Sequence, residues 1–264
     1  MMRRFQRGIA MAGTLALLAA PLASQAATTN AFNVGDLIKG SGASVYYFAP
    51  DGHRYTFPND KTYFTWYPDF SGVKTISDGQ LSTIPLGRNN VTYRPGRKMV
   101  KITTDPKTYV VDQGGVLRWV QTEQLAETLY GLNWKNQIDD IPDPFFINYR
   151  VGTPIQTASD YNPQNVMTQT TTISQDKQFD ETHVTVTIGG VQNGFVPTTI
   201  TVKVGATVTW TNADIMPHTV TGSAFDSGQL QYNQTYSRTF STAGSYDYHC
   251  SNHPVMQGTI NVVP

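Results

Sequence analysis

The chain has 264 residues, with 19 basic and 19 acidic side chains and a single cysteine. One cysteine excludes a fold held together by intramolecular disulfides, and the lack of a basic excess argues against a nucleic-acid partner. The aromatic content of 12 Phe, 14 Tyr and 4 Trp is too high for a disordered chain. We therefore expect one or two folded domains, each with its own core.

Residues 1–26 have the pattern of a secretory signal peptide. Arg3, Arg4 and Arg7 precede an apolar run, and Ser24-Gln25-Ala26 offers small residues at the cleavage positions. The run is short for a membrane anchor, which needs about 20 apolar residues. We expect export to the periplasm or the cell surface, by either the general or the twin-arginine route. Cleavage would leave 16 basic and 19 acidic residues.

Residues 31–153 contain two similar segments about 60 residues apart. In each, a strand runs into a glycine turn, a second strand follows, and a residue able to cap a helix comes next. These parts are Tyr46–Gly52, Arg54–Phe57 and Asn59 in the first segment, and Thr108–Gly114, Leu117–Val120 and Thr122 in the second. The apolar helical stripes are Tyr63, Phe64 and Tyr67 in the first, and Leu125, Ala126, Leu129 and Tyr130 in the second. We expect a β-rich α+β domain of two hairpin-plus-helix units that bury their apolar faces against each other.

This two-repeat region gives little sign of chemistry. Its one histidine, His53, adjoins a turn glycine, and Asp139, Asp140 and Asp143 lie in a proline-containing loop. We interpret all four as solvated side chains. The arrangement resembles a paired repeat module of exported bacterial proteins, which implies no established activity. Contact with a cell surface or a carbohydrate is the partner hypothesis for this region.

The rest of the chain changes character twice. Residues 154–180 are rich in Thr, Gln, Asn, Ser and Asp and have no sustained apolar period, which predicts a polar, flexible linker. Residues 181–264 then alternate apolar and polar side chains in short runs separated by turn residues. That pattern predicts a two-sheet antiparallel β-sandwich, so the whole chain should be mainly β.

The single cysteine lies at the end of one predicted strand. Cys250, His253 and Met256 are spaced three and three, and His218 follows a proline about 30 residues earlier. One thiolate, two imidazoles and a weak thioether form the ligand set of a blue-copper site, which holds one ion that cycles between Cu(I) and Cu(II). The neighbouring His249 should point to the opposite face of the strand, and we interpret it as a non-ligand.

The segments Met216–Val220 and Tyr246–Gly258 resemble the cupredoxin family, in particular its amicyanin and plastocyanin branch. The resemblance covers about residues 183–264. It implies a Greek-key β-sandwich with His218, Cys250, His253 and Met256 as copper ligands, and His253 as the exposed ligand through which electrons pass. In the family an asparagine commonly follows the first histidine and braces the ligand loop. Thr219 stands here and offers one hydroxyl instead.

Electron transfer with a redox partner protein is therefore the main functional hypothesis. The partner would dock near His253 on an apolar patch formed by Met216, Pro217, Pro254 and Val255. A periplasmic or surface copper carrier or storage protein is the alternative. A catalytic role is not expected, because a multicopper oxidase needs more than the five histidines present and a binuclear centre needs a second cysteine.

Overall fold

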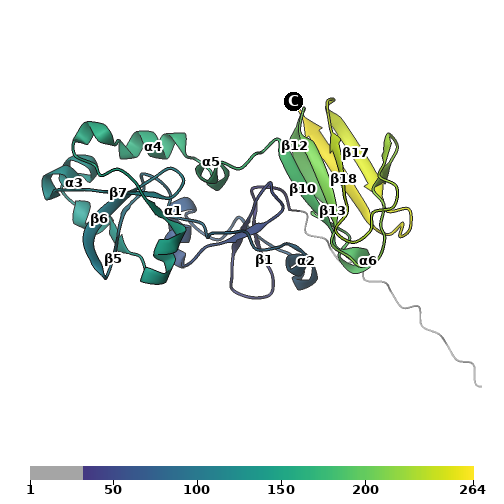
Figure 1. Cartoon of the computed structure of the whole chain (residues 1–264), viewed down its shortest axis with the longest axis horizontal. Helices are drawn as coiled ribbons and strands as arrows, with labels where there is room; N and C mark the ends of the chain where they lie inside the picture. Colours follow the sequence, from purple (N-terminus) through teal and green to yellow (C-terminus); the bar gives the residue numbers. More distant parts are fainter. Residues whose placement is uncertain (1–31) are drawn as a thin grey trace, which may run out of the picture.

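The computed structural model describes residues 32–264, so the signal peptide predicted for residues 1–26 lies outside the described residues. Figure 1 shows a β-sandwich at one end of the molecule and a pair of smaller α+β units that extend away from it. Within residues 32–264, no helix is both long enough and apolar enough to cross a membrane.

The first unit, which follows the first predicted repeat, is a four-stranded sheet in the order β3-β2-β1-β4 with two helices. Its elements are β1 (Leu37–Lys39), β2 (Tyr46–Phe48), β3 (Arg54–Thr56), α1 (Asp60–Trp66), β4 (Val73–Thr75) and α2 (Asp78–Thr83). Asn59 caps α1 as predicted, because its side chain accepts a hydrogen bond from the Thr62 amide at 2.8 Å. The predicted stripe is only partly right: Tyr63 is buried, whereas Phe64 is 44% exposed.

The second unit repeats this plan with a five-stranded sheet in the order β8-β5-β6-β7-β9. Its elements are β5 (Met99–Ile102), β6 (Asp105–Asp112), β7 (Val116–Trp119), α3 (Glu123–Tyr130), η1 (Trp134–Gln137), β8 (Ile138–Asp140), η2 (Asp143–Asn148) and β9 (Arg150–Val151). Thr122 caps α3 as predicted, through a hydrogen bond from the Leu125 amide at 3.1 Å. Leu125 and Ala126 bury the apolar face of this helix.

The two units do not share one core, contrary to the expectation that their apolar faces meet. Tyr47, Tyr55 and Tyr63 belong to a cluster within the first unit, whereas Met99 and Val110 belong to a cluster within the second. Each sheet buries its own side chains and the helix that follows its hairpin, so each unit forms a small core of its own.

Residues 154–180, predicted to be a flexible linker, are packed against both units. They form η3 (Ala158–Asp160), α4 (Pro163–Gln169) and α5 (Ile173–Lys177). Ile155 and Tyr161 join the core of the second unit, and Ile173 joins that of the first. These anchors are widely spaced among polar residues, so composition and periodicity miss them. These three buried apolar side chains nevertheless anchor the segment to the cores of both units.

Asp176 in α5 is also buried, and this predicts a pH dependence of stability. The carboxylate is 1% exposed and accepts hydrogen bonds from the Gly114 amide at 2.9 Å and the Thr92 hydroxyl at 3.2 Å. Burial nevertheless raises its pKa to about 6. Because the folded-state pKa lies above the unfolded one, stability should be full below about pH 4 and fall as the pH rises to about 6, by about 3 kcal/mol.

Chemical denaturation of Asp176→Asn between pH 4 and 7 checks this expectation. The variant should lack that part of the pH dependence, whereas Glu127→Gln, which changes an exposed carboxylate, should retain it. Parallel stability profiles for the wild type and Asp176→Asn would contradict the assignment.

The C-terminal part is the predicted two-sheet sandwich, but it is not wholly antiparallel as expected, because His183–Ile188 pairs in parallel with Thr207–Asn212 and Thr199–Lys203 in parallel with Gln257–Val263. One sheet has the order β11-β10-β13-β16 and the other β12-β18-β17-β14-β15. The first contains β10 (His183–Ile188), β11 (Phe195–Val196), β13 (Thr207–Asn212) and β16 (Thr235–Thr239); the second contains β12 (Thr199–Lys203), β14 (Thr221–Gly222), β15 (Phe225–Asp226), β17 (Gly244–His249) and β18 (Gln257–Val263). One short helix, α6 (Gly190–Asn193), follows β10. Figure 1 shows the two sheets face to face. Strand β17 ends at His249, directly before Cys250.

Trp210 on β13 is at the centre of the sandwich core and is fully buried. Its indole lies 5.3 Å from the Tyr248 ring and 6.4 Å from the Phe240 ring, measured between centroids. Trp210→Ala should therefore lower the free energy of unfolding by about 3–5 kcal/mol, because it removes the largest buried side chain of this domain. Chemical denaturation checks the value against Leu132→Ala, an exposed site where the change should be within about 0.5 kcal/mol. An equal effect of the two substitutions would contradict the packing described here.

The sandwich is attached to the first unit by direct contacts. The Thr185 amide donates to the Pro50 carbonyl at 2.9 Å, and Val196 packs in one apolar cluster with Phe32 and Phe48.

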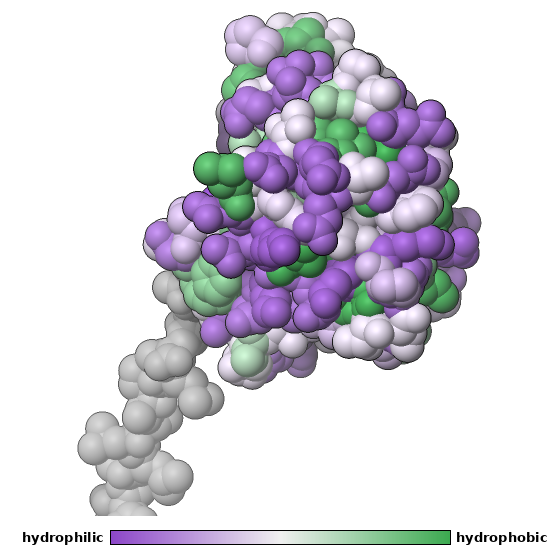
Figure 2. All heavy atoms as spheres, turned by 90° about the vertical axis from the view of Figure 1, so that its left-hand side faces the viewer, coloured by the Kyte–Doolittle hydropathy of each residue, from purple (hydrophilic) through white to green (hydrophobic). Residues whose placement is uncertain are grey.

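The end of the second unit that faces away from the sandwich has a largely polar surface. Figure 2 shows that hydrophilic residues cover most of that end face, with hydrophobic residues scattered among them.

Candidate metal centre

The site lies where two loops meet at one end of the sandwich. Strand β17 ends at His249, and the next seven positions carry Cys250, His253 and Met256 before β18 begins. His218 comes from the segment between β13 and β14. It is fixed there by a pair of main-chain hydrogen bonds with Leu230, at 3.1 and 2.8 Å. The core sheet thus presents the cysteine, and a separate loop presents the first histidine.

The loop after β17 is closed by its own main-chain hydrogen bonds. The Cys250 amide donates to the Met256 carbonyl at 3.0 Å, the Met256 amide to the His253 carbonyl at 2.9 Å, and the His253 amide to the Cys250 carbonyl at 3.2 Å. These three bonds turn the chain tightly enough to return His253 toward the cysteine that precedes it. The spacing of three residues from Cys250 to His253, and of three more to Met256, thus corresponds to this one turn.

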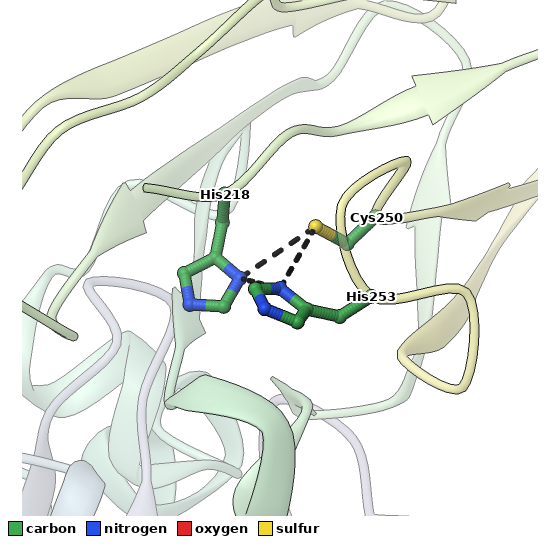
Figure 3. A group of neighbouring side chains, drawn as sticks. All are labelled: His218, Cys250 and His253. Atoms are coloured by element: carbon green, nitrogen blue, oxygen red, sulfur yellow. Dashed lines mark hydrogen bonds between the residues drawn. The ribbon is translucent and has the colours of Figure 1, made fainter. Parts of the chain in front are cut away.

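Three of the predicted side chains converge on one point (Figure 3). The Cys250 Sγ atom lies 3.6 Å from His218 Nδ1 and 3.7 Å from His253 Nδ1, and the two Nδ1 atoms are 3.3 Å apart. A metal bonded to imidazole nitrogen at about 2.0 Å and to thiolate sulfur at about 2.3 Å holds such ligand atoms about 3.3–3.8 Å apart. The triangle therefore has the dimensions of a metal's first ligands. Within residues 32–264, this is the one group of His, Cys and acidic side chains close enough to hold an ion.

Met256 is buried beside this triangle. It is 2% exposed, belongs to the sandwich core together with Cys250, and has both main-chain polar groups bonded within the ligand loop. The sequence prediction placed it as a fourth, weak ligand. The structure puts the residue in the same closed turn as Cys250 and His253, the other two predicted loop ligands.

His249, interpreted from the sequence as a non-ligand, lies on the other side of its strand. It is exposed whereas Cys250 is fully buried, as expected for successive residues of a strand. The converging group contains His218 and His253 and not His249.

Thr219 links the two loops at the position that the sequence singled out. Its amide lies 3.3 Å from Cys250 Sγ, and its hydroxyl accepts a hydrogen bond from the Ser251 amide at 2.8 Å. The threonine therefore braces the cysteine on both sides. A hydroxyl can accept this bond as an asparagine side chain would, so the departure from the expected residue preserves the contact.

Two further supporting residues were not predicted. Asp214 Oδ2 lies 3.0 Å from His218 Nε2, and this hydrogen bond is the main cause that lowers the pKa of Asp214 below its usual value. An ionised carboxylate only accepts hydrogen bonds, so it favours the proton on Nε2 and leaves the Nδ1 lone pair free for a metal. Asn252 donates to the Pro217 carbonyl at 2.9 Å and so ties the ligand loop to the His218 loop.

Signals for both residues exist in the sequence. Asp214 is four positions before His218, and carboxylates commonly orient metal-binding histidines. Asn252 lies between two predicted ligands, where an amide side chain has few other partners. Gln229, which exchanges two hydrogen bonds with Asn252, each of 3.0 Å, is too distant in sequence to be found this way.

The two histidines differ in their access to solvent. His218 is fully buried, whereas His253 is partly exposed. The two loops that carry the histidines also carry three exposed apolar side chains, Ile215, Met216 and Val255, the last 76% exposed. The centre is therefore covered on the core side and reaches the surface at His253.

Comparison with known proteins adds to this geometry. Residues 180–263 match the family described as copper binding proteins of the plastocyanin/azurin type. An amicyanin of Paracoccus denitrificans is 48% identical over 68 residues, which are 23% of this chain and 52% of the amicyanin. The plastocyanin of Scenedesmus fuscus is 34% identical over 99 residues, 30% of this chain and 98% of the plastocyanin. The chain belongs to the plastocyanin/azurin family of copper-binding proteins.

This family membership is carried by the sandwich alone. A purple cupredoxin from Nitrosopumilus maritimus aligns at 29% identity and a TM-score of 0.29, over 30% of this chain and 98% of that structure. The present chain in turn spans about half the length of the amicyanin that it matches. The family match and its amicyanin and plastocyanin relatives confirm the sequence resemblance to cupredoxins and the copper cofactor, and the two N-terminal units lie outside the matched region.

Proposed function

We propose that this cupredoxin is an exported one-electron carrier with a single type 1 copper site. His218 Nδ1, Cys250 Sγ and His253 Nδ1 would hold the ion, with Met256 as a fourth, weak ligand. Bound copper would supply the Cu(I)/Cu(II) couple. We propose no catalytic activity for the chain. The observation that carries the proposal is the 3.3–3.7 Å triangle of donor atoms at the buried end of the sandwich.

Each donor type has a distinct task in this proposal. The Cys250 thiolate is a soft ligand that copper binds in both oxidation states, and neutral imidazoles suit copper equally well. The hydrogen bonds that Thr219 donates to Cys250 Sγ and accepts from the Ser251 amide, together with those within the ligand loop, hold the ligand atoms in place independently of the metal's charge. A geometry fixed by the protein changes little when the ion gains or loses an electron, and small rearrangement favours fast transfer.

Electrons would enter and leave at the partly exposed His253. Ile215, Met216 and Val255, exposed on the same two loops, would offer an apolar contact for a partner protein, because exposed apolar patches often mark an interaction surface. Charged residues of the sandwich are few, with Lys203 and Arg238 against Glu181, Asp214, Asp226 and Asp247. Such a small excess of negative charge would give weak, salt-sensitive steering.

The division of labour along the chain is part of the proposal. Residues 1–26 would direct export to the periplasm or the cell surface, and residues 181–264 would carry the redox centre. The two-repeat module of residues 31–153, together with the packed segment 154–180, would serve contacts outside the redox reaction.

Reversible voltammetry of the copper-loaded protein tests electron transfer. A stable one-electron wave, with copper retained against a Cu(I) chelator, is the expected result. The alternative, a copper carrier or storage protein, predicts rapid loss of copper to the chelator. Rapid loss without a reversible wave would contradict the proposal.

Thr219 provides a prediction within this function. Thr219→Val keeps the shape of the side chain but removes the acceptor for the Ser251 amide, so the ligand loop should lose part of its support. We expect the visible copper band to persist while copper affinity falls by about 10- to 100-fold, as for other residues that orient metal ligands. A competition titration measures the affinity, with Thr201→Val on the exposed face of β12 as the matched control. Unchanged affinity in Thr219→Val would contradict its bracing role.

A further inference from the structure

A second candidate site lies far from the metal centre, where the two N-terminal units and α5 meet. It is a cavity of about 390 Å³. The first unit contributes Tyr55 and Arg88, the second contributes Gly114 and Arg150, and Lys177 comes from α5. No residue of the cavity belongs to the matched copper-binding region.

The charge of the lining is strongly biased. It contains three cations, Arg88, Arg150 and Lys177, and one acid, Asp176. The acid lies beneath the surface, where the Gly114 amide and the Thr92 hydroxyl already bond its carboxylate. The cavity therefore presents positive charge to solvent, and its one negative group is turned into the wall.

Two of the cations lack partners within residues 32–264. Arg88 and Arg150 are exposed, and neither guanidinium forms an ion pair, a side-chain hydrogen bond or a ring contact in this part of the chain. Arg118 of the same module differs, since it pairs with Asp112 at 3.2 Å. The Arg150 guanidinium lies over Gly114, at the lip of the cavity, where a Cβ atom would come within 3.3 Å of it.

The third cation is held in place but is not saturated. Lys177 Nζ donates to the Asn90 carbonyl at 2.9 Å and lies 5.0 Å from the centroid of the Tyr55 ring. An ammonium group has three donors, so two remain for a ligand. The buried Tyr55 ring also packs against the partly exposed Phe179 ring at 5.0 Å between centroids, and Phe179 gives the cavity an aromatic wall beside its cations.

We propose that this cavity binds a small anionic carbohydrate, of about monosaccharide size, through a carboxylate or phosphate group. Guanidinium pairs recognise both groups by bidentate hydrogen bonds. The volume exceeds that of a bare oxyanion and is at the lower end of ordinary ligand sites. The aromatic wall suits the apolar face of a sugar ring. This site gives the two-repeat module a binding role that is independent of copper.

Calorimetric titration of the full-length protein with three sugars tests the proposal. Glucuronate carries a carboxylate, glucose 6-phosphate carries a phosphate, and glucose carries neither. We expect at least one charged sugar to bind and glucose to bind at least tenfold more weakly; the two charged probes show which oxyanion is preferred. The double variant Arg88→Gln/Arg150→Gln should lose at least tenfold in affinity, because both unpaired guanidiniums are removed.

Arg97→Gln is the matched control, since Arg97 is also exposed but lies outside the cavity. It should bind as the wild type does. Equal binding of glucose and the charged sugars, equal binding by the double variant, or no binding of any probe at millimolar concentration would each overturn the proposal. A copper titration of the same samples reports the metal centre separately, so failure of one site does not obscure the other.

Discussion

Replacing Cys250 with serine is expected to abolish the intense visible absorption that the copper-loaded protein should show. The band of a type 1 centre arises from charge transfer between a thiolate and Cu(II), and Cys250 is the only cysteine in the chain. A hydroxyl is a harder and far weaker ligand, so copper affinity should fall as well, by more than about 100-fold. Absorption spectroscopy during a Cu(II) titration measures both effects.

Ser251→Ala is the control for this substitution, because it changes the next side chain but keeps the thiol. Its spectrum should match the wild type in intensity. A Cys250→Ser variant that keeps an intense visible band with stoichiometric Cu(II) would contradict the assignment of the thiolate ligand. Since Cys250 is fully buried in the sandwich core, circular dichroism should accompany the titration to confirm that the variant remains folded.

The histidines should separate into ligands and a non-ligand. His218→Gly and His253→Gly should each lower copper affinity by more than about 100-fold, because each removes one of three converging donor atoms. His249→Gly is the matched control, since it removes an adjacent exposed imidazole on the opposite strand face, and its affinity should stay within about twofold of the wild type.

Added imidazole distinguishes the two ligand positions. It should restore the copper spectrum of His253→Gly, where the vacated position is open to solvent, more readily than that of His218→Gly, where the position is fully buried. Equal rescue of the two variants would contradict the difference in access that underlies the proposed electron transfer through His253. A loss of affinity in His249→Gly as large as in His253→Gly would contradict the choice of ligands.

The sandwich could be predicted closely because its signals are local. Strands β10 and β18 alternate side chains along their length, and turn residues separate the strands. The caps at Asn59 and Thr122 were equally accessible, since one side chain decides where each helix begins. Strand alternation and helix caps depend only on residues that are close together in the sequence, so both can be predicted from the sequence alone.

Contacts between segments that are distant in sequence could not be predicted in this way. Ile173 and Tyr161 anchor the segment of residues 154–180, but each is a single apolar residue among polar ones. Phe64 fits the helical stripe yet remains exposed, because its helix packs over a narrower face than the period suggests. Only the tertiary arrangement decides which of these side chains find a partner.

The metal centre divides along the same line. Cys250, His253 and Met256 could be predicted as a group because their spacing of three and three residues matches one tight turn. His218 could be predicted because a histidine that follows a proline supplies the second imidazole of the ligand set. Asp214 supports His218 through a bond within its own loop, Asn252 ties the two loops together, and no pattern in the sequence fixes those distances. Residue types are thus sufficient to predict the metal-binding chemistry of the site. The residues that hold the predicted ligands in place depend on the folded arrangement of the two loops.

One titration tests the central claim most directly. Purified full-length protein is titrated with Cu(II) while the visible spectrum and the bound copper are measured together. A type 1 centre predicts an intense thiolate-to-copper band that grows linearly and saturates at one copper per chain. A protein that binds stoichiometric Cu(II) and stays colourless would contradict the assignment of Cys250, His218 and His253 as its ligands.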